Sequence, residues 1–139
     1  MTQSGFDPTV PDENNPETRP FWQAAREGRF LLRRCRHCAR THWYPRDVCP
    51  HCFQPGTVWE EASGRGTIHS FTIFRAAGAP EVLALIELHE GPRMLCTVLA
   101  DDIEGLTIGQ PVSVAFRAAP VGPPIPVFRP DSTGERLAD

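Results

Sequence analysis

Cys35-Arg36-His37-Cys38 is followed, ten residues later, by Cys49-Pro50-His51-Cys52. Each Cys-x-x-Cys pair can form a knuckle in which backbone amides point at the sulfurs and stabilise the thiolates. Two knuckles placed face to face give tetrahedral sulfur coordination of one zinc ion. The spacing therefore predicts a zinc ribbon held by Cys35, Cys38, Cys49 and Cys52. Four thiolates close the coordination shell, so we expect a structural metal, not a catalytic one.

Other uses of these residues remain open from the sequence. Iron in a rubredoxin-like site would take the same four ligands, and a single pair could be a redox dithiol. Zinc is favoured because duplicated pairs are typical of zinc sites and nothing indicates electron-transfer partners. His37 and His51 lie inside the pairs, but the shell is already complete, so we expect both imidazoles to point outward.

Composition limits the classes of function. The chain has 139 residues, 40% of them hydrophobic, and a formal net charge of −3, which argues against a protein built to coat nucleic acid. All 14 basic residues are arginine, so a lysine nucleophile is excluded. Eight arginines lie between residues 19 and 46, where they either offset the thiolate charge or form an anion-binding or partner surface. The cysteine usage and the absence of a visible export signal or long apolar run predict a cytoplasmic protein with no membrane partner.

A short helix and two strands frame the ribbon. Thr18 can cap the helix, Pro20 suits its first turn, and Gly28 ends it, with Phe21 and Trp22 on its apolar stripe. Strands are predicted at 30–34 and 58–61.

The second half reads as all β. Strands are predicted at 67–74, 81–89, 93–100 and 112–117, with a short edge strand near 127–128 and a tight hairpin at 90–92. Within 67–74, alternation places Ile68 and Phe74 on one face and Phe71 on the other. Glycines in 63–66 indicate a bend or bulge. Five strands favour a small closed OB-type barrel over a two-sheet sandwich.

The predicted protein is therefore mainly β, in four parts. These are a flexible arm (1–17), a helix with a rubredoxin-like zinc ribbon (18–60), an OB-fold domain (61–130) and a flexible tail (131–139). Catalytic groups are sparse: Cys96 lies in an apolar strand and is interpreted as a buried thiol, and no nucleophile or nucleotide motif is present. We expect the chain not to catalyse a reaction alone.

Taken together, these landmarks resemble a family in which a rubredoxin-like zinc ribbon precedes an OB fold. They span residues 18–130 and occur in order: Phe21-Trp22, Gly28, the two cysteine pairs, Pro45-Arg46, Trp59, Ser63-Gly64-Arg65-Gly66-Thr67, Glu90-Gly91, Ile108-Gly109 with Pro111-Val112, and Phe128-Arg129-Pro130. Ala39 departs from the pattern, since glycine is usual there, and this position can require a positive φ.

The resemblance implies a role as well as a fold. Members of this family accompany thiolase-superfamily proteins, including thiolases, hydroxymethylglutaryl-CoA synthase and lipid-transfer-protein-like aldolases. The thiolase-like chain carries the catalytic residues, and the zinc/OB chain holds the hetero-oligomer together and contributes to the acyl-CoA channel. A heterotetramer with two chains of each kind is compatible with symmetry.

Coenzyme A would need arginines for its phosphates and an apolar wall. The candidates are Arg33, Arg34, Arg36, Arg40 and Arg65 for the charge, and Phe71, Phe74 and Phe116 for the wall, although each phenylalanine is more typical of a core. Two other functions stay open: a single-stranded nucleic-acid binder, and a stand-alone acyl-CoA-binding protein or hydrolase.

Overall fold

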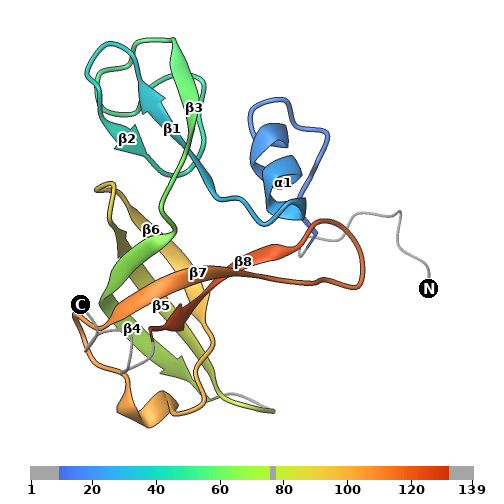
Figure 1. Ribbon diagram of the computed structural model, residues 1–139, viewed down its shortest axis with the longest axis vertical. Helices are drawn as coiled ribbons and strands as arrows, with labels where there is room; N and C mark the ends of the chain where they lie inside the picture. Colours follow the sequence, from blue (N-terminus) through green and yellow to red (C-terminus); the bar gives the residue numbers. More distant parts are fainter. Residues whose placement is uncertain (1–9, 76–77, 132–139) are drawn as a thin grey trace.

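The computed structural model describes residues 10–75 and 78–131 (Figure 1). A short helix and a three-stranded ribbon lie at one end of a closed five-stranded barrel. The predicted fold class is thus confirmed. The flexible arm and tail stay predictions, and residues 1–9 and 132–139 lie outside the described residues.

Helix α1 spans Arg19–Arg26. Gly28 ends it as predicted: its φ of 76° lets its N–H reach Ala25 O at 3.0 Å, a common helix stop. Thr18 occupies the N-cap position, but its side chain makes no capping hydrogen bond, so that detail of the prediction was wrong. Phe21 and Trp22 are buried and anchor the helix to the core.

The ribbon is an antiparallel sheet in the order β2-β1-β3. Its strands are β1 (Leu31–Cys35), β2 (Thr41–His42) and β3 (Thr57–Glu61). Arg33 in β1 pairs with His42 on one side and with Trp59 on the other. The central strand β1 therefore carries the chain directly into the first cysteine pair.

The barrel closes in the order β4-β5-β6-β8-β7. Its strands are β4 (Arg65–Phe74), β5 (Glu81–Leu88), β6 (Arg93–Val98), β7 (Pro111–Arg117) and β8 (Ile125–Pro130), with the 3-10 helix η1 (Ile103–Gly105) between β6 and β7. The closure excludes the two-sheet sandwich. The tight hairpin between β5 and β6 is present where it was predicted.

Two predicted details of the barrel were wrong. The β4–β5 register shifts between Ile68 and Ser70, so the inward face moves from Ile68 to Phe71 and Ile73, and Phe74 is 60% exposed. A bulge inserts one residue and so reverses the alternation beyond it. The second error concerns β8, which is no edge strand: it pairs along its length with β7 and meets β6 in parallel at Val98.

A joint of three residues connects the ribbon to the barrel. The N–H of Ala62 donates to Phe30 O at 2.8 Å, and the N–H of Ser63 donates to Glu90 Oε2 at 2.8 Å. Gly64, at a φ of 77°, makes the predicted bend and accepts from the N–H of Val114 at 2.7 Å. Each residue of the joint is thus bonded to a different part of the fold.

An aromatic cluster joins the helix, the ribbon and the barrel into one core. The ring of Phe30 lies 5.9 Å from Phe21 and 6.4 Å from Phe128 in β8, and Trp43 lies 5.2 Å from Phe21. These rings are continuous with the apolar barrel interior. Among the described helices, none has the length and apolar character needed to cross a lipid bilayer.

Candidate metal centre

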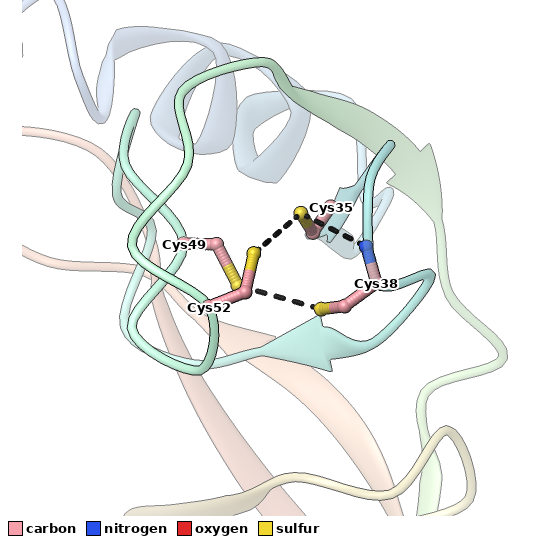
Figure 2. Close-up of side chains that lie close together, drawn as sticks. All are labelled: Cys35, Cys38, Cys49 and Cys52. Carbon is pink, nitrogen blue, oxygen red and sulfur yellow. Dashed lines mark hydrogen bonds between the residues drawn. The ribbon is translucent and has the colours of Figure 1, made fainter.

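The four predicted cysteine ligands meet at the ribbon, although one lies at the end of β1 and three lie in loops (Figure 2). All four Sγ atoms lie within 4.8 Å of one another, with Cys35 Sγ 3.5 Å from Cys52 Sγ and Cys38 Sγ 3.7 Å from Cys49 Sγ. A tetrahedral site with Zn–S bonds of about 2.3 Å has sulfur–sulfur edges of ~3.8 Å. The cluster therefore fits one zinc ion with no ligand missing.

Backbone amides prepare these sulfurs for a cation. Cys35 Sγ accepts from the N–H groups of Cys38 at 3.5 Å and His37 at 3.3 Å, and Cys49 Sγ accepts from His51 N–H at 3.3 Å. The N–H of Cys38 makes the largest contribution to lowering the pKa of the Cys35 thiol, to about 6. Because the thiolate is the metal-binding form, the amides of the first knuckle favour metal binding at Cys35.

Each knuckle ends on a residue in the left-handed region. Ala39 has a φ of 66° and donates to Cys35 O at 3.0 Å, and Phe53 has a φ of 64° and donates to Cys49 O at 2.8 Å. The positive φ at Ala39 was predicted. The same conformation at Phe53 was missed, although Phe53 directly follows the second pair just as Ala39 follows the first.

Other residues singled out earlier lie outside the cluster. His37 and His51 are exposed on the ribbon surface. Cys96 is buried in β6, its Sγ donates to Pro126 O at 3.2 Å, and burial raises the pKa of its thiol to about 11. It is a protonated core thiol at neutral pH, not a nucleophile.

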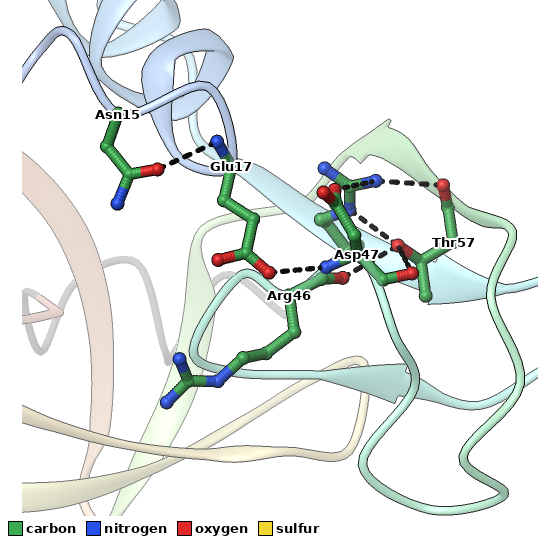
Figure 3. A network of polar contacts seen from close by, with 6 residues as sticks. Asn15, Glu17, Arg46, Asp47 and Thr57 are labelled. Carbon is green, nitrogen blue, oxygen red and sulfur yellow. Dashed lines mark hydrogen bonds and ion pairs between the residues drawn. The ribbon is translucent and has the colours of Figure 1, made fainter.

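Arg33 is used inside the ribbon. Only 8% of the residue is exposed, and its guanidinium donates to Thr57 Oγ1 at 2.8 Å and to Thr57 O at 2.9 Å. It also lies 4.6 Å from the centre of the Trp59 ring and 3.2 Å from Asp47 Oδ1. Figure 3 shows this network, in which Asp47 N–H reaches on to Glu17 at 2.9 Å and Thr57 Oγ1 donates to Arg46 O at 2.7 Å. These contacts occupy the side chain that was a candidate for binding coenzyme A.

The other residues predicted to contact coenzyme A differ in whether their side chains are free to bind a ligand. Arg34 forms an ion pair with Glu60 at 2.6 Å. Arg36, Arg40 and Arg65 are exposed, and within residues 10–75 and 78–131 none of them forms an ion pair. For the apolar wall, Phe71 and Phe116 pack against the core, whereas Phe74 is exposed.

A cleft of about 580 Å³ lies between the ribbon and the β5–β6 hairpin. It was not predicted, because its walls come from two segments that are distant in the sequence, within residues 39–51 and 90–93. Its lining includes two guanidinium groups (Arg40 and Arg93), one carboxylate (Glu90) and two aromatic side chains (Trp43 and His51). Such a surface suits an anion attached to a flat or apolar group.

Comparison with known families agrees with this architecture. A family model described as the ChsH2 rubredoxin-like zinc ribbon domain matches residues 22–57, and the ChsH2 C-terminal OB-fold domain matches residues 59–117. The chain belongs to the ChsH2 family. The four clustered cysteines all lie within the segment that the zinc-ribbon model matches, which supports a structural zinc.

Individual relatives extend this family assignment. A "DUF35 domain-containing scaffold protein" of Methanocaldococcus jannaschii is 31% identical over 105 residues, which cover 69% of this chain and 74% of that protein. A "Probable enoyl-CoA hydratase alpha subunit" of Thermomonospora curvata is 35% identical over 118 residues, covering 79% of this chain but only 36% of that protein. Thus the chain spans about a third of the length of this second relative.

A solved structure is similar over almost its whole length. It is a chain described as "Ltp2-ChsH2(DUF35) aldolase", with a TM-score of 0.73 and 30% sequence identity, and the match covers 86% of this chain and 98% of that one. The ribbon, the barrel and their order are therefore shared with a chain of this aldolase.

Proposed function

We propose that this chain is a non-catalytic, zinc-stabilised subunit of an acyl-CoA enzyme complex, and that its partner is a thiolase-superfamily chain. The observation that carries the proposal is the structural likeness to a chain of the Ltp2-ChsH2 aldolase, which covers 98% of that chain. The similarity to scaffold proteins and to a hydratase alpha subunit supports the same role.

The chemistry of the described residues is consistent with an accessory role. Four thiolates fill a tetrahedral shell, so a zinc ion held by Cys35, Cys38, Cys49 and Cys52 has no position left for water or substrate. A zinc ion bound here would cross-link the two knuckles. The ribbon and the barrel are then a scaffold that presents surfaces to a second chain.

We further propose that the cleft beside the ribbon contacts the coenzyme A part of the substrate. Arg40 and Arg93 line this cleft, and guanidinium groups bind phosphate oxygens through paired hydrogen bonds. Trp43 offers an apolar surface at the same place. Arg36 and Arg65 stay as further candidates. Arg33 and Arg34 are held by close partners at 2.8 Å and 2.6 Å, whereas Arg93 has only a longer contact, 3.7 Å from Glu87.

Co-expression tests the proposed role. This chain and the thiolase-like protein encoded beside it are produced together and purified through a tag on one of them. Co-elution, together with acyl-CoA carbon–carbon bond cleavage or formation that needs both chains, is the expected result. Separate elution with unchanged activity of the partner would overturn the proposal. CoA release by this chain alone would instead favour a stand-alone hydrolase.

The coenzyme A contact has its own test. Arg40→Ala and Arg93→Ala are measured in the purified complex by calorimetric titration with coenzyme A, beside Arg75→Ala as a matched control, because Arg75 pairs with Glu104 elsewhere on the barrel. Each cleft variant is expected to weaken binding about tenfold, the loss of one charge-assisted contact. Unchanged affinity in both would remove coenzyme A from the cleft.

A further inference from the structure

The side chain of Phe53 has no role in the fold of this chain that explains its identity. It is 76% exposed, more than any other large hydrophobic residue in the described part of the chain, and it is absent from the core cluster. The backbone N–H of Phe53 donates to Cys49 O, a hydrogen bond that any residue except proline could make.

The backbone at Phe53 makes the choice of phenylalanine unfavourable. Its φ of 64° lies in the left-handed region, which glycine adopts freely and a bulky residue rarely adopts. The first knuckle provides an internal comparison, since Ala39 occupies the same place at a φ of 66° with only a methyl group. The sequence thus keeps a large aromatic ring where the fold favours glycine and where water surrounds the ring.

The surroundings of Phe53 have a defined chemistry. Phe53 lies on the loop closed by the bridge between Val48 and Pro55, and Val48 is 49% exposed. The N–H of Arg36 donates to Gly56 O at 3.4 Å, which places this arginine beside the end of the loop. We call Phe53, Val48 and Arg36 the ribbon tip.

The ribbon tip carries positive charge that the described residues do not neutralise. Arg36 is its one charged member, and within residues 10–75 and 78–131 it forms no ion pair. Aromatic residues and arginine are the residue types that are enriched among the dominant contacts of protein–protein interfaces. A complementary surface would offer an apolar pocket with carboxylates at its border.

We propose that the ribbon tip docks onto the partner chain, with Phe53 inserted into an apolar pocket that acidic residues border. This inference rests on the proposed function, because the occupant is the thiolase-like partner. A lipid surface fits less well, since one ring and one valine offer too little apolar area for stable anchoring. Docking also explains why phenylalanine is kept at this unfavourable φ, because burial of the ring in the partner offsets the conformational cost.

Phe53→Gly separates a docking role from a structural one. Glycine removes the ring and relieves the left-handed φ, so this variant is expected to keep its metal and to melt at the same or a higher temperature. Its complex with the co-expressed thiolase-like chain is expected to weaken about 30-fold or more, as for an anchor residue of an interface. A more stable variant that binds less well is a result that a merely structural role would not produce.

Two matched variants complete the design. Ala39→Gly relieves the same backbone conformation in the first knuckle and is expected to leave the affinity for the partner unchanged. Arg36→Glu reverses the charge of the ribbon tip and is expected to weaken the complex, with a loss that shrinks as salt is added. All variants are compared by surface plasmon resonance on the immobilised partner.

Each outcome has one meaning. A wild-type complex that Phe53→Gly retains within about threefold overturns the docking inference and leaves the proposed function standing. No complex with wild-type chain overturns both. Two other results would also overturn the inference, if Phe53→Gly abolishes them while the complex persists. Self-association of the wild-type chain would assign the ribbon tip to a second copy, and co-sedimentation with phosphatidylglycerol vesicles would assign it to a membrane.

Discussion

Replacing Arg33 with lysine tests whether the guanidinium fork holds the ribbon together. Lysine keeps the positive charge that faces Asp47, but a single ammonium cannot reach both Thr57 oxygens and stack on Trp59 as Arg33 does. The change therefore removes the planar, multiply donating guanidinium group but keeps its positive charge.

The magnitude follows from the contacts. Two hydrogen bonds to Thr57 contribute about 1 kcal/mol each, and the guanidinium–Trp59 contact contributes about 0.5–1 kcal/mol. The ion pair adds little, because the Asp47 side chain is 65% exposed and solvent screens it. Arg33→Lys is therefore expected to lower the free energy of unfolding by about 2–3 kcal/mol, or the melting temperature by roughly 6–12 °C.

Thermal unfolding followed by circular dichroism measures this loss, with Arg34→Lys as the control. Arg34 is the next residue of β1, and its pair with Glu60 is partly exposed, so this second change is expected to cost less than about 1 kcal/mol. Equal and small shifts in both variants would refute the structural role of Arg33. A loss of coenzyme A binding in Arg33→Lys without a loss of stability would return Arg33 to the candidate site.

Three more predictions follow from the site and the barrel. Elemental analysis is expected to find one zinc ion per chain, lost in Cys38→Ala and Cys49→Ala together with ribbon structure; a folded metal-free wild type would contradict this. Because burial raises the pKa of Cys96 to about 11, its thiol is expected to react slowly with Ellman's reagent at pH 8 and faster as pH rises towards 11; rapid labelling that is lost in Cys96→Ala at pH 7 would refute this. Gly66→Ala is expected to cost about 1–3 kcal/mol in a denaturant titration, because the new Cβ would lie 2.6 Å from a backbone carbonyl oxygen of β5; unchanged stability would contradict the close approach.

Much of the fold could be predicted because its signals are local. The two cysteine pairs fix the ribbon, Gly28 ends the helix, and the hairpin at 90–92 fixes the β5–β6 pairing. The family resemblance led to the same architecture. These features depend on residue types that tolerate few conformations or few ligand geometries.

The missed features depend on tertiary contacts. The sequence from Ile68 to Ser70 contains no residue type that predicts a bulge. The register shift is visible only in the folded barrel. The interior use of Arg33 requires Thr57 and Trp59, which arrive from another strand. An arginine in a strand is equally compatible with a surface, so the sequence alone could not separate a core guanidinium from one that meets a ligand.

The joint at Ala62, Ser63 and Gly64 has a consequence for assembly. Because its residues are bonded separately to Phe30 just before β1, to the β5–β6 hairpin and to β7, the two halves would meet the proposed partner with their mutual orientation already set. Association then requires little loss of conformational entropy at this point. The joint thus holds the ribbon and the barrel at a fixed angle before binding. A flexible insert in the joint would remove this preorganisation, and each binding event would then cost conformational entropy.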